Sequence, residues 1–287
     1  MSSQSQLEQV LRLLKPRKAL HIGASYGQEA SLYQALGIET WHIEAIPEVF
    51  ECLQQNIAGL GGQHPVHACL SSEAGLFTTF HIANNDGLSS SLLPLGRHRD
   101  EYPSITYEKE IAVSTETVNS LIEKQLIDPD IDFILIDAQG AERLILEVTT
   151  NLLNMEDLKG VIVETAVVPL YEGGSTYLEI AEILAKYNLH LRHAAFGPHG
   201  WTDAVFMKPY WRSAICSSSI HSASGDETEE RAVPENEAES NEPAETSIDY
   251  KFFLRNESAI AETTEFCPWD KPAFEEDILK AINLLIP

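Results

Sequence analysis

The sequence predicts an α/β fold: a Rossmann-like, seven-stranded, mostly parallel sheet with an antiparallel terminal strand and helices on both faces. First, residues 18–44 have the pattern of a strand, a glycine-containing turn, a helix and a second strand. Second, short apolar strands alternate with helical segments along residues 47–187. Third, the strands expected at 189–195 and 203–208 are joined by a link too short for a crossover helix, so they must pair antiparallel.

The opening unit ends each of its two strands on residues suited to a nucleotide. Small residues follow the first strand, and they let the chain turn tightly and let a ligand approach the backbone amides. The second strand ends on an acidic residue whose carboxylate can accept hydrogen bonds from both hydroxyls of an adenosine ribose. The candidate cofactor-binding residues here are Gly23, Ala24, Ser25, Gly27 and Glu44. Small residues after a strand also serve packing alone, and that interpretation stays open.

Apolar spacing and terminal residues predict the elements on either side of this unit. A helix at 4–14 precedes it, and another begins at Pro47 and ends before Gly59. A strand at 65–70 brings Ser71 to its tip, beside the expected place of an adenine ring. Strands are also predicted at 77–82 and 110–113, a helix at 116–125, and a polar run at 84–91 that is either a plain surface loop or a binding loop.

Asp137 is the strongest single candidate for a functional residue. The apolar run IDFILI at 131–136 is typical of a parallel strand covered on both faces. It places Asp137 at the carboxyl end of the strand, where doubly wound sheets bind ligands. The alternative is that Asp137 only caps the following helix, expected over 142–153. A shorter strand at 161–163 ends on Glu164 by the same logic.

Two histidines lie at or after a strand end on the same side of the sheet. They are His193 and His199, which follow the helix expected at 175–187. An imidazole there can accept the proton of a reacting hydroxyl. A lone histidine in a loop is more often simply solvated, and both interpretations remain.

The composition argues against a nucleic-acid-binding, metal-binding or membrane-spanning protein. The 287 residues, 44% of them hydrophobic, can bury one substantial core plus an appendage. With 19 basic and 44 acidic residues the net charge is −25, which opposes binding to nucleic acid or to anionic lipid. The four cysteines lack disulfide-framework or zinc-site spacing, so we expect no metal and a reducing, cytoplasmic environment. No signal-peptide core is present, nor an apolar run of the roughly 18 residues that a membrane span needs.

Charge and apolar spacing divide the chain into three parts. Residues 1–212 form the α/β domain. Residues 213–250 hold ten acidic residues and only Arg231 against them, which is the composition of a disordered linker. Residues 251–287 regain apolar residues and end in an amphipathic helix, with Phe274 and Ile278 on one stripe. That stripe requires a partner surface: the same domain, which we favour, another subunit of a homo-oligomer, or another protein.

Several blocks, in this order, resemble the FkbM family of class I S-adenosylmethionine-dependent methyltransferases over residues 18–208. The most specific is IDFILIDAQGAE at 131–142, which the family writes as Ile-Asp-Phe-Leu-Lys-Ile-Asp-Val-Gln-Gly-Ala-Glu. The others are HIGASYG at 21–27, similar to Asp-Val-Gly-Ala-Asn-x-Gly, IEAIP at 43–47, LSSSL at 88–92 and VSTETV at 113–118. The expected sheet, with its antiparallel ending, is also that of class I methyltransferases.

The resemblance implies methyl transfer from S-adenosylmethionine to a hydroxyl of a sugar, glycan or natural-product acceptor. It implies that the amides of residues 23–27 face the methionine part, that Glu44 binds the ribose, and that Asp137 orients the reacting centre or acts as base, with His199 as another candidate base. The sequence departs from the family pattern at His21, Ser25, Asn119 and Leu135, where the family has an acidic residue, Asn, Asp and Lys. A non-catalytic binding or scaffold module is therefore the first alternative. A nicotinamide-dependent oxidoreductase, which needs a second half-sheet after residue 150, is the other.

Overall fold

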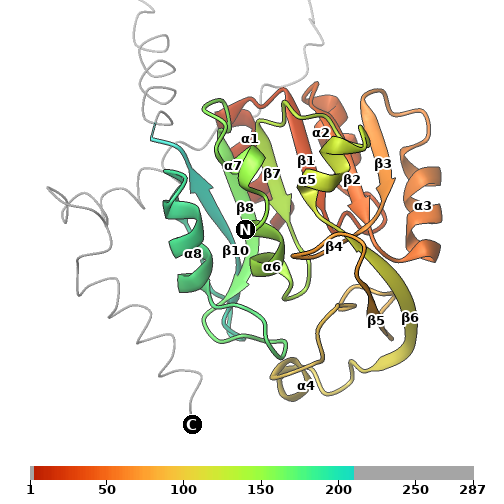
Figure 1. Cartoon of the computed structure of the whole chain (residues 1–287). Coiled ribbons are helices and arrows are strands. Elements are labelled where there is room, and N and C mark those ends of the chain that lie inside the picture. Colours follow the sequence, from red (N-terminus) through yellow and green to blue (C-terminus); the bar gives the residue numbers. More distant parts are fainter. Residues whose placement is uncertain (1–2, 210–287) are drawn as a thin grey trace, which may run out of the picture.

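A seven-stranded sheet forms the centre of the computed structural model, which describes residues 3–209 (Figure 1). Its strand order is β3-β2-β1-β7-β8-β10-β9, and β10 runs antiparallel to both of its neighbours. The predicted fold class is confirmed, and the antiparallel strand lies one place in from the edge. The strands are β1 Lys18–Ile22, β2 Glu39–Glu44, β3 Gln63–His67, β7 Phe133–Ile136, β8 Gly160–Ala166, β9 His190–His193 and β10 Trp201–Met207.

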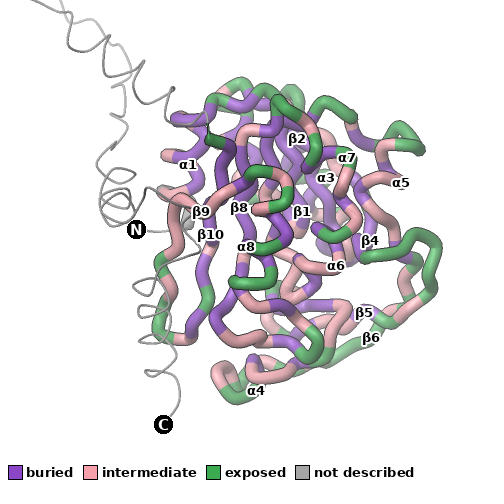
Figure 2. The backbone as a smooth tube through the Cα atoms, turned by 60° about the vertical axis from the view of Figure 1, so that its left-hand side comes forward, coloured by how far each residue is buried: buried purple, intermediate pink, exposed green. Residues whose placement is uncertain are grey.

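Helices cover both faces of this sheet, and the most deeply buried residues lie between the layers (Figure 2). One face carries α1 (Ser3–Leu14), α2 (Ala30–Ala35) and α3 (Pro47–Ile57). The other carries α5 (Val118–Glu123), α6 (Glu142–Leu146), α7 (Thr150–Leu153) and α8 (Tyr177–Ala185). Strand residues such as Leu20 and Ile134 are fully buried, and each such side chain contributes about 1.5 to 3 kcal/mol of hydrophobic stabilisation.

A second, three-stranded sheet lies beyond the carboxyl ends of the parallel strands (Figure 1). Its order is β4-β6-β5, from β4 (Cys69–Leu70), β5 (Phe77–Ala83) and β6 (Tyr107–Glu116), and α4 (His98–Glu101) lies in the connection between β5 and β6. The single strand expected at 65–70 is therefore wrong. The chain leaves β3 after His67, and Cys69 pairs with Thr115 of the second sheet.

Two other boundaries differ from the sequence prediction. The helix expected over 142–153 is two short helices, α6 and α7, and between them the Thr149 hydroxyl donates a 2.7 Å hydrogen bond to the Ile145 carbonyl. Such a bond competes with the helical pattern. Strand β8 continues past Glu164, so that residue lies inside the strand instead of at its tip.

Within residues 3–209 no helix combines the length and the apolar character needed to cross a bilayer. The acidic linker expected at 213–250 and the amphipathic helix expected in 251–287 lie outside the described residues.

Candidate cofactor-binding and active site

The turn after β1 is shaped by the close approach of β7. Gly23 has a φ of +78°, and a Cβ atom on it would lie 1.7 Å from the Asp137 carbonyl oxygen. Only glycine accommodates both the left-handed backbone and this contact. The turn therefore brings the backbone of Gly23 directly against Asp137.

The amides of this turn donate to the protein itself. Gly23 N and Ala24 N both donate to the Ile43 carbonyl, at 3.0 and 2.9 Å, and Gly27 N donates to the Ala24 carbonyl at 2.9 Å. Ser25 N donates to Glu44 Oε2 at 2.9 Å. The expectation that these amides face a ligand is not met, because β2 ends close enough to accept their hydrogen bonds. The turn can contribute to a ligand site through the cavity surface that Gly23 and Ser25 form, instead of through amide hydrogen bonds.

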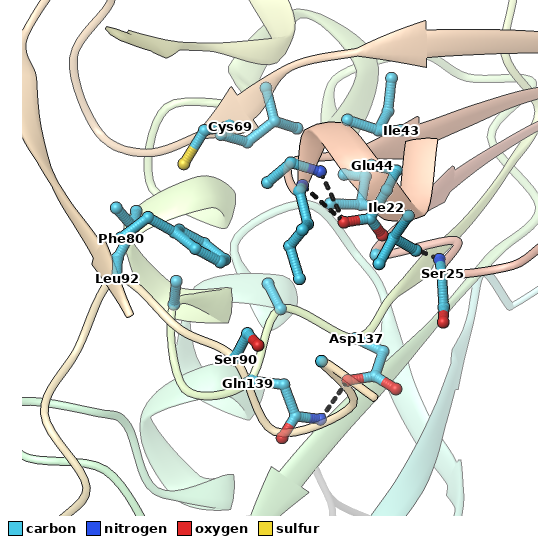
Figure 3. A pocket seen from close by; sticks show the side chains of 18 of the residues that line it. Ile22, Ser25, Ile43, Glu44, Cys69, Phe80, Ser90, Leu92, Asp137 and Gln139 are labelled. Carbon is cyan, nitrogen blue, oxygen red and sulfur yellow. Dashed lines mark hydrogen bonds between the residues drawn. The ribbon is translucent and has the colours of Figure 1, made fainter. Parts of the chain in front are cut away.

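Glu44 ends β2 with its carboxylate at the edge of a cavity (Figure 3). Its Oε1 accepts from the Ala45 and Ile46 amides at 2.9 and 2.8 Å, and its Oε2 accepts from Ser25 N. Burial raises the pKa of Glu44, and these three amides oppose that rise. Because a carboxylate oxygen has two acceptor positions, Oε2 keeps one position for a further donor.

This first cavity lies between the carboxyl ends of β1, β2 and β7 and the second sheet. Phe80 and Leu92 form one wall, and Cys69 lies beside them (Figure 3). Burial raises the pKa of the Cys69 thiol to about 12, so it is protonated and not nucleophilic. Apolar walls with a carboxylate at one side suit a flat heteroaromatic base attached to a sugar. Further apolar lining comes from Ile22, Ile43, Val49, Leu70 and Ile145.

A second cavity lies on the other side of the glycine turn, against α1. It is lined by Leu7 of α1, by His21 and Leu135 of the central strands, and by Glu29 and Asp203. The two cavities share Gly23, Ser25, Leu88 and Asp137 in their linings. A ligand that passes the turn at Asp137 can therefore occupy both.

Asp137 belongs to a network in which one amide holds two carboxylates. Gln139 Nε2 donates to Asp137 Oδ1 at 2.7 Å and to Glu164 Oε2 at 2.9 Å, and the Tyr171 hydroxyl donates to Gln139 Oε1 at 2.5 Å. Burial raises the pKa of both acids, and the pKa of Glu164 is raised the more strongly because the Asp137 carboxylate lies beside it. Of the two acids, Asp137 is therefore the one that ionises more readily.

Comparison with known proteins assigns this site to a family. A family model described as the methyltransferase FkbM domain matches residues 21–197, well over half of the chain. The chain belongs to the FkbM methyltransferase family. It is therefore a methyltransferase of a family whose methyl donor is S-adenosylmethionine. The nicotinamide-dependent alternative is wrong, because β8, β9 and β10 extend one sheet and build no second half-sheet.

Several solved structures share part of the chain path at low sequence identity. The TehB-like enzyme of Corynebacterium glutamicum has 13% identity and a TM-score of 0.38, with 70% of this chain and 87% of that chain covered. Fibrillarin of Aeropyrum pernix, with natively bound S-adenosyl-L-methionine, has 11% identity and a TM-score of 0.41, covering 71% and 74%. The O-methyltransferase of Bacillus cereus, in complex with SAH, has 13% identity and a TM-score of 0.40, with 72% of this chain and 82% of that chain covered. These similarities are too low to transfer a ligand or a substrate. No curated protein matches the chain.

The FkbM pattern has an acidic residue where this chain has His21, and the structure shows what the exchange does. His21 is buried, with its ring 5.9 Å from that of Tyr33 and 5.8 Å from that of His42. Burial, with a smaller contribution from His42, lowers the pKa of His21 to about 3. The imidazole is neutral at pH 7, so the negative charge of the family's first acid is absent from this position.

Five candidate site residues lie outside both cavities: Gly27, Ser71, Glu164, His193 and His199. His199, in the loop before β10, has its Nδ1 2.9 Å from Glu101 Oε2 and its ring 4.8 Å from that of Tyr102. Ser71 is buried, and its amide donates to the Glu116 carbonyl. The structure does not bring either residue into the cavities that Asp137 lines. His193, at the end of β9, lines neither of them.

Two acidic residues of the second cavity, Glu29 and Asp203, did not come from the sequence analysis. Burial, Asp137 and Glu29 raise the pKa of Asp203 to about 6. One signal was available, because Asp203 is the single charged residue in the strand WTDAVFM. Within residues 3–209, no group of three or more His, Cys, Asp or Glu side chains could hold a metal ion.

Proposed function

We propose that this FkbM methyltransferase binds S-adenosylmethionine across the two cavities and methylates a hydroxyl oxygen of a sugar, glycan or natural-product acceptor. The observation that carries the proposal is the junction at Gly23 and Asp137. There a cavity with apolar walls and the Glu44 carboxylate meets a second cavity lined by acidic side chains. This sequence of surfaces matches a nucleoside joined to a cationic amino acid.

Each part of the junction has a role in this proposal. The apolar walls of the first cavity hold the adenine ring, and the free acceptor position of Glu44 binds a ribose hydroxyl. Gly23 and Ser25 support the link between the nucleoside and the amino acid. Ala24 and Gly27 keep the turn in shape through the hydrogen bond between them. Ser71, outside the cavity, supports the wall next to the adenine through its neighbour Leu70.

The acceptor hydroxyl enters from the side of Glu164. A third cavity, of about 30 Å³, is lined by Glu164, Tyr171 and the partly exposed Trp201. A cavity of this size with polar side chains in its lining has room for a hydroxyl-sized group. Trp201, which lines this cavity and is 37% exposed, offers apolar surface for a sugar ring.

The chemistry asked of the protein is positioning and proton transfer. The donor supplies an electrophilic methyl group: the acceptor oxygen forms the new C–O bond as the C–S bond breaks. Holding the two reactants in line supplies much of the rate. The hydroxyl proton passes to the Asp137 carboxylate, which Gln139 holds in place, directly or through the neighbouring Glu164. His199 would serve as base only if an acceptor brought it toward this junction.

Titration calorimetry with S-adenosylmethionine and S-adenosylhomocysteine tests the proposal first. We expect binding of both, with protection from thermal unfolding. Incubation with a methyl-labelled donor and a panel of sugars and hydroxylated natural products then identifies the acceptor. Absence of heat and of thermal protection with either ligand contradicts the proposal.

The neutral His21 favours one alternative, a binding module that keeps the fold without turnover. This alternative predicts that S-adenosylhomocysteine binds and that no member of the panel is methylated. Methylation of any hydroxylated acceptor excludes it.

A further inference from the structure

The second cavity contains acidic groups and no basic side chain. Its carboxylates come from three places in the fold: Glu29 just before α2, Asp137 after β7 and Asp203 on β10. Neither Lys nor Arg is among its lining residues. Nothing in the lining therefore balances these charges.

The one imidazole in this lining adds no positive charge. His21 is 4% exposed, and its Nδ1 has no hydrogen-bond partner among the described residues. It is neutral at pH 7. A buried polar nitrogen without a partner is unusual in a folded protein, and the residue that carries it lines the acidic cavity.

The acidic groups of the cavity oppose one another's ionisation. Burial raises the pKa of Asp203, and the nearby Asp137 and Glu29 carboxylates raise it further. Burial likewise raises the pKa of Glu29, and Asp137 adds to that rise. The carboxylate of Asp203 accepts no hydrogen bond within residues 3–209, whereas its carbonyl accepts one from Gln6. A cation that enters the cavity offsets the repulsion between these carboxylates and gives the Asp203 carboxylate a hydrogen-bond donor.

We propose that the second cavity is a subsite for an alkylammonium group, in which Asp203, with Glu29, binds the α-ammonium of the methionine part of the cofactor. This inference rests on the proposed function. The pair supplies the negative charge that His21 does not supply at the position of the family's first acid. The cofactor is the source of the ammonium because this cavity shares Gly23, Ser25 and Asp137 with the nucleoside cavity.

The test compares ligands that differ only at the amino acid. S-adenosylhomocysteine carries the ammonium, its desamino analogue lacks it, and 5′-methylthioadenosine lacks the amino-acid chain beyond the thioether. Calorimetry on the wild type requires no variant: we expect S-adenosylhomocysteine to bind at least about tenfold more tightly than the desamino analogue, the size of a charge-assisted hydrogen bond in a partly buried site. Equal affinities overturn the inference.

Variants then assign the ammonium to residues. We expect Asp203→Asn to weaken S-adenosylhomocysteine about tenfold while 5′-methylthioadenosine keeps its affinity, and Glu29→Gln to act in the same direction. The control is Asp157→Asn, which removes a charge from an exposed residue and should leave both affinities unchanged. An unchanged affinity of S-adenosylhomocysteine in both cavity variants overturns the inference.

The same titrations separate the two proposals. A wild type that binds neither S-adenosylhomocysteine nor 5′-methylthioadenosine contradicts the proposed function and this inference with it. A wild type that binds both ligands with the same affinity contradicts this inference alone. Circular dichroism and thermal unfolding of each variant establish that a loss of binding is not a loss of fold.

Discussion

Gln139 donates a 2.7 Å hydrogen bond to Asp137 from a backbone that lies in the left-handed region, with a φ of +50°. A non-glycine residue in this region costs about 1 to 3 kcal/mol, and such strain gathers at functional sites. The same amide holds Glu164, and Tyr171 fixes the other end of the carboxamide. The strained turn thus fixes where the two carboxylates lie.

Asp137→Asn keeps the shape of this network and removes its charge. The Asn oxygen can still accept the hydrogen bond from Gln139, so the fold and the cavity should be retained. If Asp137 accepts the hydroxyl proton, kcat should fall by about 100-fold or more, whereas the dissociation constant of S-adenosylhomocysteine should change by less than about threefold. Steady-state kinetics with the acceptor found in the panel, together with calorimetry, measures both. Unchanged turnover would refute this role and point to Glu164 or His199.

Gly23→Ala should damage the junction far more than a glycine replacement elsewhere. The new methyl group would meet the Asp137 carbonyl at 1.7 Å, so β1 and β7 would have to separate. Gly37→Ala is a matched control, because Gly37 also has a positive φ, +69°, but its Cβ would enter open space. The free energy of unfolding, measured with urea, should fall by about 1 kcal/mol in the control because of the backbone conformation alone. In Gly23→Ala it should fall by several kcal/mol more. Similar losses in both variants would mean that the contact relaxes without cost.

The parts of the fold that sequence predicted are those set by local patterns. The apolar run before Asp137 and the small residues after Ile22 each specify a strand end and the turn after it, and parallel strands bring such ends to one edge. The second sheet could not be predicted in this way. Most of β6 is exposed or half-buried, so its apolar pattern is weak, and its partners Cys69 and Phe77 lie far back along the chain.

The same distinction applies to the site: residues placed by local patterns were predicted, and features that depend on tertiary contacts were not. Glu44 and Asp137 follow from their places at strand ends, and both line the first cavity. Which acceptors the turn amides bind depends on where β2 ends relative to the turn, and no local sequence pattern gives that position. The acidity of the second cavity depends on side chains from three separate elements, and their pKa shifts arise only when folding buries them together.

Glu44→Ala should weaken every ligand that contains the ribose. The change removes the ribose acceptor and leaves the Ser25, Ala45 and Ile46 amides without their shared partner. We expect S-adenosylhomocysteine and 5′-methylthioadenosine to lose affinity by a similar factor, about tenfold or more, in contrast to Asp203→Asn, which should affect only the first. Calorimetry with both ligands makes the comparison. Glu48→Ala, which removes an exposed ion pair with Lys109, is the control and should have little effect.

Glu142→Gln should stabilise the protein at neutral and alkaline pH. Burial raises the pKa of Glu142 to about 7 from a usual value of 4.5, although its Oε1 accepts the amides of Ala138 and Gly140 at 2.9 and 3.1 Å. At a pH between these two pKa values, the unfolded chain has released the proton while the native state keeps it. The wild-type free energy of unfolding therefore falls as the pH rises through this range. A glutamine oxygen can accept the same two amides without this loss. The variant should therefore gain relative to the wild type between pH 5 and pH 8, by up to about 3 kcal/mol. Urea unfolding of both proteins at the two pH values measures the gain, and an equal difference at both would mean that Glu142 is ionised in the native state throughout.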